Sequence, residues 1–98
     1  MAEIGWTAEA ERWLRDIHDY IAETNPEAAL RLVQGIYRQA QILRRFPQMG
    51  HRYGQASDRE VRVLLYGHYR IAYLLRPDGN VDVLGVFHAA MDIDRYLL

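Results

Sequence analysis

Three side chains that together could cleave RNA, Arg62, Arg70 and His88, occupy segments that we expect to be neighbouring strands. Attack by the 2′-hydroxyl of RNA requires a base, an acid and a cation beside the phosphate, and arginine, histidine, tyrosine and glutamate supply these without a metal. Convergence of the three side chains on one sheet surface would form a ribonuclease site. The alternative is that both arginines are solvated strand positions and that His88 is a hydrogen-bonded residue between a strand and a helix.

Other chemistries lack the residues that they require. The sequence contains no cysteine and no lysine, which excludes thiolate nucleophiles, sulfur-based zinc clusters and Schiff bases. The four histidines do not follow a metal-ligand spacing, and no glycine-rich nucleotide-binding loop is present. We therefore expect no metal and no cofactor, and no firmly catalytic residue beyond the three candidates above.

Charge is distributed unevenly along a chain whose net charge is −1. Residues 1–30 and 77–98 are acidic, whereas residues 31–76 carry nine arginines and two acidic residues. The basic middle can form a local patch, but strong phosphate binding usually accompanies a larger positive charge. Five tyrosines interleave with these arginines and form either a base-stacking surface or half-buried positions: Tyr37, Tyr53, Tyr66, Tyr69 and Tyr73.

The first half of the sequence predicts a short strand and two amphipathic helices. Residues 3–6 alternate as a strand does, and Thr7 is a suitable N-cap for the first helix. Asn25 and Pro26 begin the second helix, which we expect to end before Phe46. Each helix carries one apolar stripe: Ala10, Trp13, Leu14, Ile17 and Ile21 in the first, and Ala29, Leu32, Val33, Ile36, Ala40 and Leu43 in the second. We interpret Gly35, inside the second helix, as a point of close packing against the sheet.

The second half predicts a loop over residues 46–58 and then a three-stranded meander. Residues 60–67 and 69–76 alternate with a period of two around a Gly67-His68 turn. Residues 77–80 form a second turn, residues 81–87 a third strand, and residues 90–97 a short helix.

The predicted order is therefore β-α-α-β-β-β-α, an α+β fold with a helical hairpin packed on a small antiparallel sheet. A chain of 98 residues is expected to form one domain, residues 1–98. No apolar run approaches the roughly 20 residues that span a bilayer, and the N-terminus resembles no secretory signal. We expect a cytoplasmic protein without membrane contact.

Several motifs resemble the RelE/ParE superfamily of toxins from type II toxin–antitoxin systems. They span nearly the whole chain, and their order and spacing carry the resemblance more than any single one does. The motifs are W-T-x-x-A-x-x-x-L-x-x-I-x-x-Y-I at 6–21, N-P-x-A-A at 25–29, F-P-x-x-G at 46–50, Y-R-I-x-Y at 69–73 and H-x-x-M-D-x-x-R-x-L at 88–97.

The long hairpin and the His-x-x-Met-Asp tail look most like the ParE branch, whose members poison DNA gyrase and have no ribonuclease site. This resemblance implies growth arrest through gyrase and neutralisation by a cognate antitoxin, with operator DNA bound only through that antitoxin. Residues expected to contact the target or the partner are Arg59, Arg62, Arg70, His88, Met91, Asp92 and Arg95.

Two alternatives stay open. A RelE-like toxin cleaves mRNA on the ribosome, and Arg70 and His88 fall near positions where some RelE-like enzymes keep a catalytic arginine and histidine. The absence of lysine and the net charge of −1 depart from that branch. The other alternative is an inactive homologue that retains only antitoxin binding.

Overall fold

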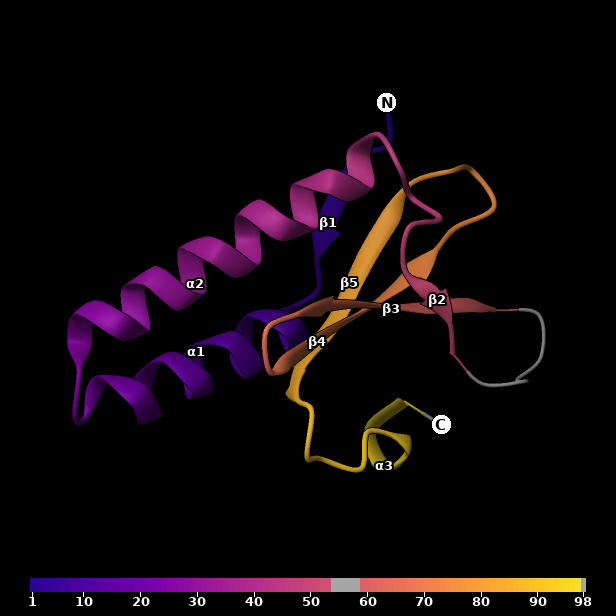
Figure 1. Cartoon of the computed structure of the whole chain (residues 1–98). Helices are drawn as coiled ribbons and strands as arrows, with labels where there is room; N and C mark the ends of the chain where they lie inside the picture. Colours follow the sequence, from indigo (N-terminus) through magenta and orange to yellow (C-terminus); the bar gives the residue numbers. More distant parts are fainter. Residues whose placement is uncertain (54–58, 98) are drawn as a thin grey trace.

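The computed structural model describes residues 1–53 and 59–97, so part of the predicted 46–58 loop lies outside the described residues. The elements follow one another as shown in Figure 1: β1 (Ile4–Trp6), α1 (Ala8–Ala22), α2 (Pro26–Ala40), a 3₁₀ helix η1 (Gln41–Arg44), β2 (His51–Arg52), β3 (Glu60–Tyr66), β4 (Tyr69–Leu75), β5 (Val81–His88) and α3 (Asp94–Leu97). Among these residues, no helix combines the length and hydrophobicity needed to cross a membrane.

The two long helices begin at the predicted caps. The Thr7 hydroxyl accepts a hydrogen bond from the Ala10 amide at 3.1 Å, and the Asn25 side chain accepts one from the Ala28 amide at 3.0 Å. Each cap satisfies one of the amides that a helix N-terminus leaves without a partner, and Pro26 needs no such partner. The α-helical part of the second helix ends at Ala40, earlier than predicted, and continues as η1.

The five strands form one sheet in the order β1-β5-β4-β3-β2. The α+β class is confirmed, and β3, β4 and β5 pair antiparallel as expected; β2 also pairs antiparallel with β3. One edge departs from the antiparallel pattern, since β1 pairs parallel with β5. Parallel neighbours require a long crossover, and here everything from α1 to β4 supplies it. The two-residue β2 was missed because so short a strand has no periodicity.

The helices cover one face of the sheet, and the C-terminal segment covers only part of the other, where Leu65 is 57% exposed. On one face, α1 and α2 pack onto the strands through a core that includes Leu14, Ile36 and Ile71. On the other face, Phe87 packs against Ile93, which immediately precedes α3. The last helix is shorter than the predicted 90–97. A turn and a bend occupy residues 89–91, and α3 begins at Asp94.

Gly35 confirms the predicted close packing of α2 on the sheet. A side chain at this position would collide with the Tyr66 ring and hydroxyl on β3. The missing side chain therefore lets the backbone of α2 approach the end of the β3–β4 hairpin.

Candidate functional site

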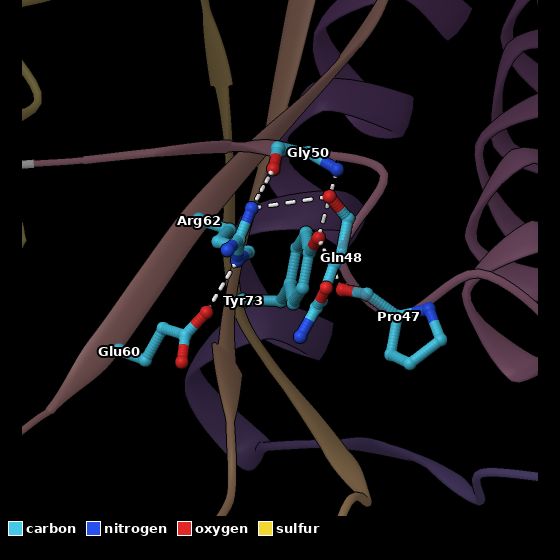
Figure 2. A network of polar contacts seen from close by, with 6 residues as sticks. All are labelled: Pro47, Gln48, Gly50, Glu60, Arg62 and Tyr73. Carbon is cyan, nitrogen blue, oxygen red and sulfur yellow. Dashed lines mark hydrogen bonds and ion pairs between the residues drawn. The ribbon is translucent and has the colours of Figure 1, made fainter.

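Arg62, one of the predicted cleavage residues, has its hydrogen bonds within the protein. Its Nη1 donates to the Gly50 carbonyl at 2.6 Å and to the Gln48 carbonyl at 3.1 Å. Its Nε donates to the Glu60 carboxylate at 2.7 Å, and the side chain is only 14% exposed. Figure 2 shows how these groups surround the guanidinium. Little of this cation is available to a phosphate.

Tyr73 completes the same network. Its hydroxyl donates to the Pro47 carbonyl at 2.7 Å and accepts from the Gly50 amide at 2.9 Å, and the residue is fully buried (Figure 2). Burial raises the pKa of Tyr73, although the Gly50 hydrogen bond and the charge of Arg62 act in the opposite direction. We call these residues the Tyr73 network: Pro47, Gln48, Gly50, Glu60, Arg62 and Tyr73.

The Tyr73 network connects two motifs that are far apart in the sequence. F-P-x-x-G contributes Pro47 and Gly50, and Y-R-I-x-Y contributes Tyr73. Gly50 has no room for a side chain, because a Cβ would lie 2.8 Å from both the Tyr73 ring and the Val63 carbonyl. The two motifs therefore have a structural function, which the sequence reading did not assign to them.

Arg70 lies on the face of the sheet opposite to Arg62. In the β3–β4 register Arg62 pairs with Tyr73 and Arg70 pairs with Leu65. Paired residues share a face and successive residues alternate, so Arg62 and Arg70 project in opposite directions. Of the two hypotheses from the sequence, convergence of the three candidate residues on one surface therefore does not hold in this structure.

His88 shares a face with Arg62 but lies toward the other end of the sheet. Its partner on β4 is Tyr69, whereas the partner of Arg62 is Tyr73, so roughly 13 Å of strand separates them. The His88 Nδ1 accepts a hydrogen bond from the Ala90 amide at 3.1 Å, and its ring meets Tyr69 edge-on with centroids 5.4 Å apart. This geometry matches the alternative of a hydrogen-bonded residue where the last strand ends.

An apolar groove opens beside His88. Its volume is about 300 Å³, and we call it the α1 groove. One wall is formed by residues of α1, and the other by residues at the ends of β4 and β5. The lining residues are Trp13, Asp16, Ile17, Tyr20, Ile21, Tyr69, Val86, His88 and Met91. Tyr20 is 77% exposed at this site. The groove therefore combines a deep apolar floor with an aromatic side chain open to solvent.

The remaining candidates do not form a single cluster. Arg59 is exposed before β3 and lines a smaller cavity with Trp13 and Tyr96. Met91 packs partly against the Phe87 core. The C-terminal candidates Asp92 and Arg95 are exposed, and Asp92 precedes α3, outside the helix in which we expected it.

The tyrosines of the basic middle are not a stacking surface. Tyr73 is buried, and the others pack partly against the two cores. The Tyr37 hydroxyl donates to the Glu11 carboxylate at 2.7 Å, and burial together with this bond raises the pKa of Tyr37 to about 12. The interpretation as half-buried positions is confirmed. Within the described ranges, no group of three or more His, Asp or Glu residues is placed to hold a metal.

The fold is shared with chains of two solved toxin–antitoxin systems. A chain of the chromosomal ParDE system from P. aeruginosa superposes with a TM-score of 0.72 at 22% identity, over 90% of this chain and 96% of that chain. A chain of the RelBE2 toxin–antitoxin complex from Mycobacterium tuberculosis superposes with a TM-score of 0.57 at 20% identity, over 89% and 96%.

The sequence comparisons define the family more narrowly. The model of the ParE toxin of the type II toxin–antitoxin system parDE matches residues 4–93. Toxin RelE2 of Caulobacter vibrioides is 36% identical over 90 residues, which are 92% of this chain and 98% of the relative. The chain belongs to the ParE toxin family.

Proposed function

We propose that this chain arrests growth by inhibiting DNA gyrase through direct protein contact, and that a cognate antitoxin keeps it inactive. The observation that carries the proposal is that the candidate ribonuclease residues are not assembled into one site. Arg62 is bound within the Tyr73 network, and Arg70 projects from the opposite face. A toxin in which no acid, base and cation are assembled is better suited to act by binding its target, which supports the gyrase hypothesis within the ParE family.

The α1 groove is the proposed antitoxin site. Its apolar floor and its position along α1 suit the apolar face of an amphipathic segment that orders on binding. We expect operator DNA to be contacted only by the antitoxin, since this chain has a net charge of −1.

The name of one relative favours a second candidate function. Toxin RelE2 carries the name of the branch that cleaves mRNA on the ribosome. Under this hypothesis Arg70 or His88 would act on the RNA after the ribosome completes the site. If the chain binds neither gyrase nor the ribosome and has no activity on either, it is the inactive homologue.

A paired assay tests the proposal. The toxin is separated from its antitoxin under denaturing conditions and refolded. It is then added to gyrase with ATP and supercoiled plasmid, and in parallel to programmed ribosomes with mRNA. We expect linear DNA or lost supercoiling with intact mRNA. Cuts in the mRNA with unchanged plasmid would overturn the proposal in favour of the ribonuclease.

A further inference from the structure

The residues that the Tyr73 network holds in place expose an unusual combination of side chains. Phe46 is 56% exposed and Met49 is 52% exposed. Arg44, Arg45 and Arg52 are also exposed, and residues 44–52 contain no acidic residue. In the described part of the chain, no ion pair joins these three arginines to a carboxylate. We call residues 44–52 the 44–52 segment.

Hydrogen bonds hold the backbone of the 44–52 segment at several points. The Met49 amide donates to the Phe46 carbonyl at 3.0 Å, and the Arg44 carbonyl accepts from the Ala2 amide at 3.0 Å. Tyr73 and Arg62 bind the backbone of the same segment at Pro47, Gln48 and Gly50 (Figure 2). Phe46 and Met49 are therefore presented on an ordered backbone, which lowers the entropic cost of binding a partner.

One of the exposed arginines is placed at a cost to stability. Arg52 on β2 lies directly opposite Arg62 on β3. Like charges at opposed positions destabilise a sheet, and Glu60 neutralises only Arg62 here. An acidic partner beside Arg52 would remove this repulsion.

We propose that the 44–52 segment docks on the target protein, at an acidic surface with an apolar pocket that accepts Phe46 and Met49. This inference rests on the proposed function and names the surface that performs it. Arginine, aromatic residues and methionine are the types enriched in protein interfaces. The arginines could bind a nucleic acid, but Met49 would contribute little to that binding, and the net charge of −1 would not attract a polyanion to the chain.

The antitoxin is expected to bind a different surface, the α1 groove. The α1 groove lies where Tyr69 pairs with His88, and the 44–52 segment lies where Arg52 pairs with Arg62, toward the other end of β3 and β4. The proposal therefore assigns the target and the antitoxin to separate surfaces of the same sheet.

The test measures gyrase and antitoxin affinity for the refolded full chain. One variant removes the apolar contacts, Phe46→Ala with Met49→Ala, and another removes the charge, Arg44→Ala with Arg45→Ala and Arg52→Ala. Leu30→Ala and Arg31→Ala are the matched controls, because both residues are exposed on α2. We expect each test variant to lose about tenfold or more in gyrase affinity and to keep its antitoxin affinity. The two control variants should keep both affinities.

Each contrary result has a separate meaning. Wild-type binding that neither variant weakens would overturn the assignment and leave the proposed function intact. An equal loss of antitoxin affinity would reassign the segment to the antitoxin. Binding of a single-stranded RNA that only the arginine variant weakens would reassign it to nucleic acid. A wild-type chain that does not bind gyrase would overturn the proposed function, and this inference with it.

Discussion

The Tyr73 network and the α1 groove lie toward opposite ends of the sheet and differ in how their polar and apolar groups are satisfied. In the network, the Tyr73 hydroxyl and the Arg62 guanidinium bind the backbone of residues 47–50. In the groove, apolar side chains line a space of about 300 Å³ that no other part of the described chain fills.

This difference separates residues that hold the fold from residues that are free to bind. Buried polar groups with all their partners rigidify a structure, and breaking one interaction leaves others unsatisfied. An open apolar groove gains stability only when a partner covers it. Substitutions in the network should therefore lower the free energy of unfolding, whereas substitution of an exposed groove residue such as Tyr20 should lower affinity alone.

The largest effect is expected from Gly50→Ala. The new methyl group would lie 2.8 Å from the Val63 carbonyl, a backbone atom that cannot turn aside, and from the Tyr73 ring. We expect the free energy of unfolding in urea to fall by about 3 kcal/mol. Met49→Ala, an exposed neighbour, is the control and should change it by less than about 0.5 kcal/mol. Equal stability of Gly50→Ala and wild type would show that the segment is not held tightly.

Tyr73→Phe removes one oxygen and should cost about 2 kcal/mol. The buried Gly50 amide and the Pro47 carbonyl would each lose a hydrogen-bond partner, while the ring would still fill its place in the core. Urea denaturation at neutral pH measures the change, with Tyr20→Phe on the exposed face of α1 as the control. If the free energy of unfolding falls no more than in the control, the hydrogen bonds of Tyr73 do not stabilise the fold.

Tyr20→Ala tests the α1 groove. Removing this exposed ring from the α1 groove should weaken antitoxin binding about tenfold, because aromatic side chains dominate many interfaces. The free energy of unfolding should not change. Leu30→Ala, an exposed apolar residue on α2, is the control. Unchanged antitoxin affinity, measured by calorimetry, would place the antitoxin elsewhere.

The smallest effect concerns Tyr37 and alkaline pH. Unfolded Tyr37 ionises near pH 10.0, whereas the pKa of the folded side chain is about 12. The unfolded state therefore loses its proton first, and stability should fall as pH rises from 10 to 12. Tyr37→Phe should make this decline shallower. Thermal unfolding at pH 9, 10 and 11 measures it, and an identical decline in the variant would contradict the assigned cause.

Much of the fold was predictable because local signals agreed with one another. Thr7 and Asn25 cap the helices as predicted, and Gly67-His68 forms the expected turn between β3 and β4. The parallel pairing of β1 and the existence of β2 were not predictable, since both depend on contacts between distant segments.

The separation of Arg62 from Arg70 was predictable from the sequence. A two-residue turn at Gly67-His68 pairs Tyr66 with Tyr69, and counting back places Arg62 and Arg70 on opposite faces. The sequence held this information in the length of the turn. The role of Tyr73 was different, because nothing local indicates that residues 47–50 lie over its hydroxyl.

The most direct test of the account measures two affinities for two variants. Tyr20→Ala changes the α1 groove, and Phe46→Ala with Met49→Ala changes the 44–52 segment. The refolded chains are titrated with antitoxin and with gyrase. The account predicts that the first variant loses only antitoxin affinity and that the second loses only gyrase affinity. Loss of both affinities in both variants would contradict the separation of the two surfaces.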